Sequence, residues 1–361
     1  MSDRLFLRPT GFVDAPFGYD GQVLRLAGGL CFFAHVELIR VSDGDRVSQT
    51  LLPVEELDAH LNALPAEVAE PARATLARLT TARASLKLGA RTVPLDQPQV
   101  MAILNVTPDS FSDGGKHSDP ALHAMDMLQA GAALIDVGGE STRPGAKPVW
   151  EGDEIQRAVP VIQRVTAGGA AISIDTRKAG VMEAALDAGA GLVNDVSALS
   201  WDDRALHVVA QRGCPVILMH HQGSPETMQH DPRYDDVLID VYDWLEARIE
   251  TAVAAGIARE KILIDPGIGF GKTLRHNLTL LNNLSLFHGL GCAIVLGASR
   301  KRTIGALSGE APVDQRLGGS IAFAILAAAQ GVQMMRVHDV FETVQALRVW
   351  RGLRDTALSP L

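Results

Sequence analysis

From about residue 100 onward, the chain repeats one pattern of apolar and polar positions. A short run rich in Val and Ile is followed by a polar or glycine-rich break, and then by a longer stretch with helical periodicity. The apolar runs are VMAIL, ALIDV, AISID, GLVND, PVILM, KILID, AIVLG and MMRVH. Because polar residues do not alternate along them, these runs are typical of parallel strands that are buried on both faces.

Helical periodicity fills the intervals between the runs. The pattern predicts helices over residues 120–130, 151–165, 178–188, 202–211, 237–255, 278–286, 318–330 and 340–353. Several of them end at a glycine, as helices commonly do. Eight strand and helix units between residues 98 and 361 predict an α/β fold, a (β/α)8 TIM barrel with an N-terminal α+β extension. A doubly wound parallel sheet is the alternative, and the even spacing of the units favours the closed barrel.

The first 97 residues follow a different pattern. Residues 4–39 mix short apolar runs with Gly, Pro and aromatic residues, whereas residues 55–86 have a helical periodicity that we expect to break at Pro65 and Pro71. We therefore expect an extension of unknown role over residues 1–97, joined to a barrel domain over residues 98–361. Because no motif in the extension carries chemistry, we expect a packing or interface role, and residues 1 to 95 to be dispensable for chemistry.

Composition and charge limit the classes of partner. Of the 361 residues, 47% are apolar and 21% are charged, which is typical of a globular protein. The net charge of −9 creates no field that would attract nucleic acid or an anionic membrane. The three cysteines lie far apart with no zinc or disulfide spacing, and we see neither a signal peptide nor a membrane span, so we expect a cytoplasmic protein.

The residues that end the apolar runs are the first candidates for a site, because barrel enzymes bind their substrates at the C-terminal ends of the strands. Asp136, Asp175 and Asp265 end three runs, and Asn105 and Asn194 hold equivalent positions. A buried carboxylate is costly unless it meets a donor or a cation. Taken singly, each acid could be satisfied by nearby backbone or an arginine. Together, the five side chains can hold a heterocycle that presents several N–H donors.

Cations gather at the same strand ends. Arg143 follows the second run, Arg300 and Lys301 follow the seventh, and Arg336 and His338 close the eighth. Any one of them alone would be interpreted as a solvated charge. In an acidic protein, their common position predicts a bound phosphate or pyrophosphate.

Two motifs resemble a P-loop and a metal site but are not interpreted as either, and two glycine-rich segments are candidates for parts of the site. The GIGFGKT segment at residues 267–273 has three residues between its outer glycines where a P-loop requires four, and neighbouring His220 and His221 lack a metal-ligand pattern. Residues 107–115 and 138–146 are interpreted as mobile lids beside the site rather than as two ordinary turns, because they follow the first two strands.

The ordered motifs NVTPDSFSDGG, IDVGGESTRPGA, SIDTRK, NDVS, LMH, DPGIGFGK, GASRK and RVHD resemble the dihydropteroate synthase family over residues 100–348. The resemblance implies condensation of 6-hydroxymethyl-7,8-dihydropterin pyrophosphate with 4-aminobenzoate, giving 7,8-dihydropteroate and pyrophosphate. It also implies Mg²⁺ as a cofactor, sulfonamides as inhibitors and a homodimer.

The resemblance also implies roles for individual residues. The pterin contacts would be Asp175, Asn194, Asp265 and Lys301, with Met219 and Phe270 as apolar walls and Gly297 beneath. The pyrophosphate would be held by Asn105, Thr142, Arg143, Arg336 and His338, and the metal by Asn105. The aminobenzoate side would comprise Phe111, Thr142, Pro144, Ser299 and Lys301. The catalytic residues would be Asp113, Arg143 and Lys301.

The family's reaction explains why the sequence shows no nucleophilic triad. Pyrophosphate departs to leave a resonance-stabilised pterin cation, which an unprotonated arylamine captures, so the protein must position the reactants and stabilise charge. Two other functions share these features in part. One is a pterin-binding methyltransferase that works with a corrinoid protein, which needs no pyrophosphate clamp, and the other is a non-catalytic pterin-binding protein.

Overall fold

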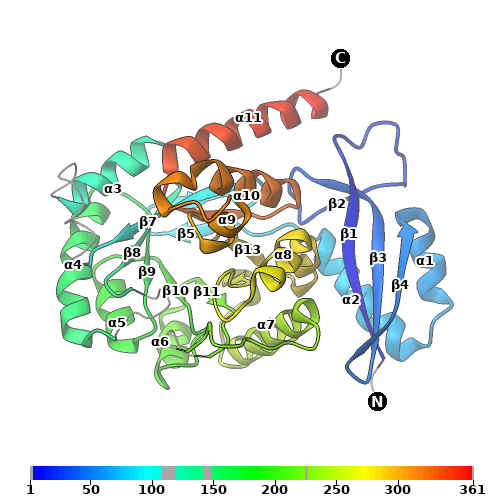
Figure 1. Ribbon diagram of the computed structural model, residues 1–361, viewed down its shortest axis with the longest axis horizontal. Helices are drawn as coiled ribbons and strands as arrows, with labels where there is room; N and C mark the ends of the chain where they lie inside the picture. The colour runs from blue at the N-terminus through cyan, green and yellow to red at the C-terminus, as the bar shows by residue number, and fades with distance from the viewer. Residues whose placement is uncertain (1–2, 108–118, 142–147, 224–226, 360–361) are drawn as a thin grey trace.

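A closed barrel of eight parallel strands forms the centre of the molecule (Figure 1). The computed structural model describes residues 3–107, 119–141, 148–223 and 227–359. In barrel order the strands are β7 (Gln99–Asn105), β8 (Leu134–Gly138), β9 (Ile172–Asp175), β10 (Leu192–Asp195), β11 (Val216–Met219), β12 (Ile262–Asp265), β13 (Ala293–Leu296) and β14 (Met334–Val337). The predicted (β/α)8 barrel is therefore confirmed.

Helices connect successive strands and cover the outside of the barrel (Figure 1). They are α3 (Pro120–Gln129), α4 (Glu151–Ala167), α5 (Ala179–Asp187), α6 (Ala205–Arg212), α7 (Val237–Ala254), α8 (Leu274–Asn282), α9 (Arg302–Leu307), α10 (Leu317–Ala329) and α11 (Val340–Leu358), with short 3-10 turns η2 (Arg259–Lys261), η3 (Leu284–Leu290) and η4 (Val313–Gln315). Within the described ranges, no helix has both the length and the apolar character that crossing a bilayer requires.

The interior of the barrel is apolar at the end where the strands begin. Alternate strand residues point inward, and the first inward residues, such as Met101, Leu134 and Leu192, form one buried cluster. A hairpin of β5 (Leu86–Leu88) and β6 (Arg91–Val93) adds Leu86, Leu88, Val93 and Leu95 to this cluster. The hairpin therefore closes this end of the barrel, although it lies within the predicted extension, before residue 97.

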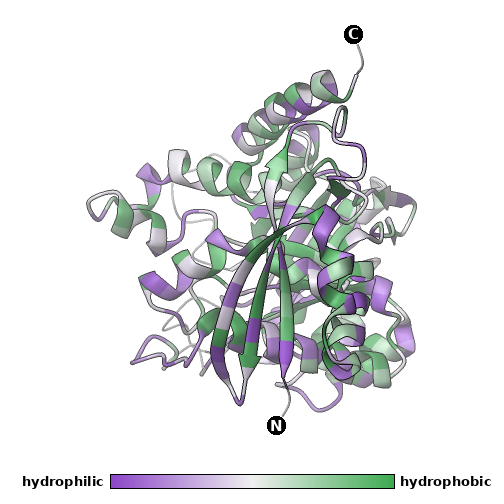
Figure 2. Ribbon diagram, turned by 90° about the vertical axis from the view of Figure 1, so that its right-hand side faces the viewer, coloured by the Kyte–Doolittle hydropathy of each residue, from purple (hydrophilic) through white to green (hydrophobic). Residues whose placement is uncertain are grey.

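The rest of the extension is an antiparallel sheet with two helices. Its strands are β1 (Arg4–Val13), β2 (Leu24–Arg25), β3 (Phe32–Ser42) and β4 (Asp45–Pro53), and its helices are α1 (Val54–Asn62) and α2 (Ala66–Thr80). Figure 2 shows the long strands of this sheet in front of the barrel. Phe6 packs edge-on against Tyr242 of α7 at 5.2 Å between ring centroids, and Ser285 Oγ donates to the Pro9 carbonyl at 2.8 Å. The predicted α+β extension is confirmed, and its core is continuous with that of the barrel.

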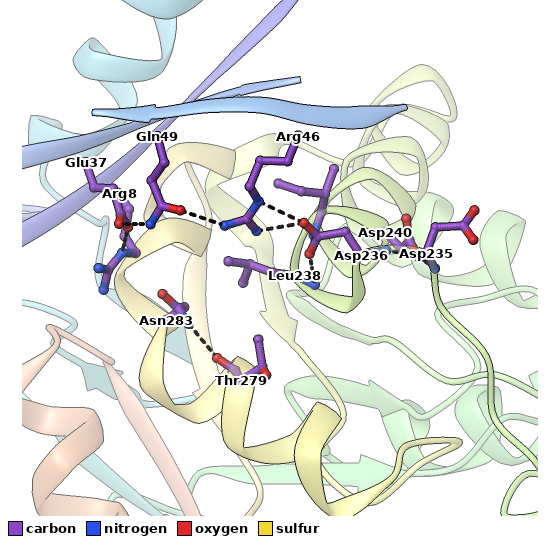
Figure 3. Close-up of polar contacts among 11 residues, drawn as sticks. Arg8, Glu37, Arg46, Gln49, Asp235, Asp236, Leu238, Asp240, Thr279 and Asn283 are labelled. Atoms are coloured by element: carbon purple, nitrogen blue, oxygen red, sulfur yellow. Dashed lines mark hydrogen bonds and ion pairs between the residues drawn. The ribbon is translucent and has the colours of Figure 1, made fainter. Parts of the chain in front are cut away.

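Polar contacts join the same sheet to α7. Arg46 of β4 donates to Asp236, the N-cap of α7, at 2.7 and 3.0 Å, and Asp236 in turn accepts from the Leu238 amide (Figure 3). Gln49 links Arg46 to Glu37, which also pairs with Arg8. The charged residues of the sheet therefore point toward the barrel helices as well as toward each other.

The predicted and observed helices differ in detail. The helix expected to break at Pro71 continues through it, although Pro71 is the sixth residue of α2 and cannot donate the backbone hydrogen bond of that turn. The helix expected over residues 278–286 begins at Leu274, where Thr273 provides the N-cap, and its C-terminal part is the 3-10 turn η3. The short helix α9 has no counterpart among the predicted elements.

Candidate active site

Three of the predicted polar residues meet at the C-terminal end of the barrel. Asp175 ends β9, Asn194 is its register partner on β10, and Asp265 ends β12. Each is only 5% exposed. Met219 ends β11 as the register partner of Asp265 and is buried beside it. The structure therefore places at one end of the barrel the amide, the two carboxylates and the Met219 wall that the family resemblance implies for a pterin.

Asp136 lies one layer deeper than these residues. It pairs in register with Ser173, whereas Gly138, two residues later on β8, pairs with Asp175. Its side chain is fully buried and accepts from Ser173 Oγ at 2.5 Å, Asn194 Nδ2 at 3.0 Å and Arg336 Nε at 2.6 Å. The sequence grouped Asp136 with the acids that hold a heterocycle. In the structure it contacts the side chains beneath the pocket.

Arg336 connects Asp136 to Asp175. Its Nη2 donates to Asp175 Oδ2 at 2.6 Å, while Asp175 Oδ1 is buried and has no hydrogen-bond partner among the described residues. Burial raises the pKa of Asp175 even though Arg336 opposes the shift. Burial disfavours the charge of Arg336, but the facing carboxylates Asp136 and Asp175 raise its pKa above the ordinary value. Asp175 therefore keeps one buried carboxylate oxygen without a hydrogen-bond partner among the described residues.

Lys301 and Phe270 form the opposite side of the pocket. The Lys301 ammonium lies 4.4 Å from the centroid of the Phe270 ring and donates to the Ile268 carbonyl. Burial lowers the pKa of Lys301 to about 8, and the Asp265 carboxylate limits the shift. Burial also raises the pKa of Asp265, whose Oδ1 accepts from the Gly267 amide at 2.7 Å. These contacts place a cation above an aromatic ring beside a carboxylate.

Small residues allow this side of the site to form. A Cβ on Gly297 would lie 3.3 Å from Asp265 Oδ2, which is a tight contact. Gly267 has a φ of +69°, and a Cβ there would lie 1.8 Å from the His220 carbonyl oxygen. Only glycine therefore fits at position 267 without displacement of the backbone.

Lys272 turns into the protein rather than toward a phosphate. Its Nζ lies 2.8 Å from His220 Nδ1 and donates to the Gly267 and Phe270 carbonyls at 3.0 and 3.1 Å. Burial, together with the charge of Lys272, lowers the pKa of His220 to about 2. The GIGFGK segment is therefore held by its own lysine, which is an arrangement unlike that of a P-loop lysine.

The last two strands bring two further predicted residues together. Ser299 Oγ and His338 Nδ1 are 3.1 Å apart, and the His338 amide donates to the same hydroxyl at 3.2 Å. Arg300 instead pairs with Asp339, at 3.0 Å from Nε to Oδ2. Its charge is compensated by Asp339, as that of Arg336 is by Asp136 and Asp175.

Five predicted residues lie outside the described ranges: Phe111, Asp113, Thr142, Arg143 and Pro144. Most of the two glycine-rich segments, 107–115 and 138–146, lies there too. Asn105 is described, at the end of β7. Its Oδ1 would be 3.5 Å from a Cβ on Gly138, so it stands at the edge of the pocket beside β8.

Sequence reasoning missed a buried charged cluster beside the site. Lys178 Nζ donates to the Glu140 and Glu154 carboxylates and to the Val149 carbonyl, the last at 2.8 Å. Glu140 also accepts from the Val149 amide at 3.3 Å and from Arg177 at 2.8 Å. The cluster therefore joins residues on both sides of 142–147. The available signal was the lysine of SIDTRK, three residues after Asp175.

Comparisons with known proteins show the family to which the barrel is similar. The family model described as pterin binding enzyme matches residues 101–338. The chain is 49% identical to a dihydropteroate synthase of Escherichia coli over 270 residues, which is 73% of this chain and 95% of that protein. A dihydropteroate synthase of Neisseria meningitidis is 46% identical, again over 270 residues, with 72% of this chain and 94% of the relative covered.

Solved structures are similar over the same share of the chain. The Yersinia pestis dihydropteroate synthase with a sulfonamide drug has 48% identity and a TM-score of 0.72, and covers 75% of this chain and 99% of its own. The Xanthomonas albilineans dihydropteroate synthase in complex with 7,8-dihydropteroate has 43% identity and a TM-score of 0.68, and covers 75% of this chain and 98% of its own.

Proposed function

The chain belongs to the dihydropteroate synthases, within the family of pterin binding enzymes, and from this membership we propose how its residues carry out the reaction. The reaction condenses 6-hydroxymethyl-7,8-dihydropterin pyrophosphate with 4-aminobenzoate to give 7,8-dihydropteroate and pyrophosphate. The relatives carry the name of the synthase, which favours this activity over a methyltransferase and over a non-catalytic pterin-binding protein.

The observation that carries the proposal is the free acceptor at Asp175. A pterin presents adjacent N–H donors along its amino-pyrimidine edge, and carboxylate and amide oxygens accept such donors. Asp175 Oδ1 is buried without a partner among the described residues, Asn194 is the register partner of Asp175, and Asp265 ends β12 at the same end of the barrel. Met219 and the Phe270 ring would enclose the faces of the heterocycle, with Lys301 and Gly297 at its edge.

The pyrophosphate would lie toward β7, β13 and β14. Arg336 and His338 stand at the end of β14, and Asn105 at the end of β7. Thr142 and Arg143, outside the described residues, are assigned to the same group by resemblance. The cations would hold the anion through charge-assisted hydrogen bonds.

Asn105 fits the proposed Mg²⁺. The described residues contain no group of three His, Cys, Asp or Glu side chains that could hold a metal. Mg²⁺ at a phosphate site needs few protein ligands, because water and phosphate oxygens complete its octahedron, and the Asn105 amide oxygen is a suitable hard ligand. When bound, the ion would neutralise charge on the pyrophosphate.

The chemistry begins with the leaving group. The bond from the pterin methylene carbon to the pyrophosphate oxygen breaks, and its electron pair leaves with pyrophosphate. The amine lone pair of 4-aminobenzoate then forms the carbon–nitrogen bond, and the nitrogen loses a proton. Arg336 and Arg143 stabilise the departing anion, Asp175 and Asp265 stabilise the pterin cation, and Asp113 lies by resemblance near the reacting carbon.

The aminobenzoate side is proposed at Ser299 and Lys301. The Ser299 hydroxyl lies against His338, and the Lys301 ammonium can pair with the benzoate carboxylate. Phe111, Thr142 and Pro144 are assigned here by resemblance and lie outside the described residues. Sulfonamides, which are similar in shape and charge to aminobenzoate, would occupy the same position as inhibitors.

We also propose a homodimer and a cytoplasmic location. Exposed apolar side chains lie along α10 and α11, where Leu326, Phe341, Val349 and Leu353 are 58%, 62%, 63% and 70% exposed. Surfaces of this kind are typical of interfaces between copies. All three cysteines are free and buried, which suits a reducing compartment. Sedimentation analysis of the full chain tests the dimer.

A steady-state assay tests the proposed function. Release of pyrophosphate should require both 6-hydroxymethyl-7,8-dihydropterin pyrophosphate and 4-aminobenzoate, and 7,8-dihydropteroate should form in equal amount. Release that proceeds at the same rate without the amine would contradict the condensation. Omission of Mg²⁺ should slow the reaction with both substrates present.

A further inference from the structure

Asp136 occupies a position from which it can set the orientation of other groups without touching a ligand. It is fully buried, two register pairs and so one inward-facing layer below Asp175. Its Oδ2 accepts from both Asn194 Nδ2 and Arg336 Nε, and its Oδ1 accepts from Ser173 Oγ. Asp136 is therefore the acceptor in all of its hydrogen bonds to described residues.

An ionised carboxylate can only accept hydrogen bonds, so whichever end of the Asn194 amide faces Asp136 must be the NH₂ group. The other end, Oδ1, accepts no hydrogen bond from a described residue and stands in the layer of Asp175. We propose that Asp136 is a positioning residue that fixes the donor and acceptor pattern of the pterin pocket, by holding Asn194 with its carbonyl oxygen toward the ligand. This inference rests on the proposed pterin pocket and deepens it.

The carboxylate matters because the two ends of an amide have nearly the same shape. Without Asp136, Asn194 can rotate by half a turn at little steric cost and present its NH₂ group to the N–H donors of the pterin. Two donors would then face each other in a buried site, where an unmade hydrogen bond is costly. Asp136 therefore determines, from beneath the pocket, which end of the Asn194 amide faces the pterin.

Asp136 also orients Asp175, through Arg336, which contacts both carboxylates. One carboxylate oxygen of Asp136 holds Arg336 Nε, and Nη2 of the same guanidinium holds Asp175 Oδ2. Asp175 Oδ1 is left for the ligand. The two acceptors of the pocket are thus oriented by one buried carboxylate, through Asn194 on one side and through Arg336 on the other.

A charge-conserving exchange tests the proposal. Asp136→Asn, Asn194→Asp and the double variant are compared with the full-length wild type by calorimetric titration with 6-hydroxymethylpterin. Asp136→Asn should weaken pterin binding about 10-fold or more, because Asn194 loses the partner that fixes its orientation. In the double variant, Asn at 136 donates to Asp at 194, which keeps an acceptor toward the ligand, so binding should be tighter than in either single variant.

Kinetics give a second readout that a general structural defect would not reproduce. Asp136→Asn should raise KM for the pterin pyrophosphate by a much larger factor than KM for 4-aminobenzoate. Asp195→Asn is the matched control, because Asp195 is equally buried on β10 but accepts only from Ser197 and Leu199 among the described residues. This control should leave the affinity for the pterin unchanged.

Pterin affinity in Asp136→Asn equal to that of the wild type would overturn the proposal, and so would a double variant that binds no better than Asn194→Asp. The second comparison holds even where Asp136→Asn does not fold, because it uses only the other two variants. A wild-type protein that binds no pterin would instead contradict the proposed function, so the two failures are distinguishable.

Discussion

Asp175 combines two tasks in one carboxylate, and its two oxygens separate them. Oδ2 neutralises Arg336 at 2.6 Å, and Oδ1 is free for a ligand. We predict that Asp175→Asn weakens pterin binding by about 1 to 3 kcal/mol, because an amide can place an NH₂ group against the ring donors. Calorimetric titration with the pterin pyrophosphate measures the loss. Asp265→Asn should behave similarly, and unchanged affinity in both variants would remove these residues from the site.

Lys301 should make turnover sensitive to alkaline pH. Burial lowers the pKa of its ammonium to about 8, with Asp265 opposing the shift, so the charged form predominates below that pH and is lost above it. We predict that kcat/KM for 4-aminobenzoate falls about tenfold per pH unit above pH 8, since only the ammonium pairs with the carboxylate.

Lys301→Arg tests the assignment, because a guanidinium keeps its charge throughout this range. The alkaline decline should disappear in this variant, whatever its absolute rate. A decline that persists at the same pH in Lys301→Arg would assign the titration to another group.

For single residues, the sequence predicts which side chains lie at the C-terminal end of the barrel, but not how far below that end each one lies. Asp175 and Asp265 end their strands, as their positions at the ends of apolar runs indicate. Asp136 looks equivalent in the sequence, but β8 continues through Val137 and Gly138, both apolar, and so places Asp136 one layer lower. The last residue of a strand depends on pairing with its neighbours, which the local pattern does not contain.

Among the elements, the start of α4 and the end of β8 depend on one lysine. Lys178 contacts Glu140 after β8 and Glu154 in the first turn of α4, and all three side chains are at most 6% exposed. We predict that Lys178→Met destabilises the protein by about 3 to 5 kcal/mol, because it leaves Glu154 buried without its cation and Glu140 with only Arg177. Denaturant unfolding measures the change.

The double variant Lys178→Met/Glu154→Leu provides the control. It removes the carboxylate that Lys178→Met leaves without a cation, so its free energy of unfolding should be higher than that of Lys178→Met alone. If the second substitution lowers stability further, the loss in Lys178→Met comes from packing of the lysine stem rather than from unpaired charge.

The predicted helices are most accurate where their ends carry local signals. Pro120 begins α3 as predicted, and Asp119 caps it by accepting from the Ala121 amide at 2.9 Å. Helix α6 ends before Gly213, which has a φ of +60°. Helix α9 was missed because its six residues are too few to show a periodic pattern. The 3-10 turn η3 follows α8 and packs against β1 and α2, which are contacts that the local pattern does not contain.

For the molecule as a whole, the division into extension and barrel is less sharp than the change of sequence pattern at residue 97 indicates. The sheet of the extension shares its core with α7 and η3, and Arg83 donates to the His288 and Cys292 carbonyls at 3.0 and 3.2 Å. The β5–β6 hairpin closes the barrel. These are contacts between segments far apart in the chain, so local periodicity could not reveal them.

The relatives indicate which part of the chain the reaction requires. The Escherichia coli synthase aligns over 270 residues, which is 95% of its own length but only 73% of this chain. Most of the extension therefore has no counterpart there. The proposed site residues agree with this, since all of them lie at or beyond Asn105.

Two truncations should separate the two roles of the N-terminal region. Removal of residues 1–82 keeps Arg83 and the hairpin, so the barrel end stays closed and we expect turnover to persist. Thermal stability should be lower, because the apolar surface around Tyr242 becomes exposed.

Removal of residues 1–95 also takes away Leu86, Leu88, Val93 and Leu95 and opens the cluster around Met101 and Leu134 to water. We predict that this second protein loses cooperative thermal unfolding, followed by circular dichroism, and with it pyrophosphate release. This prediction revises the expectation that residues 1–95 are dispensable for chemistry, because the hairpin within them packs into the barrel interior. Equal unfolding and turnover in the two truncations would show that the hairpin does not support the barrel. Loss of turnover in a folded protein lacking only residues 1–82 would instead show that the sheet of the extension contributes to the site, and Arg46 on Asp236 would be the first contact to substitute.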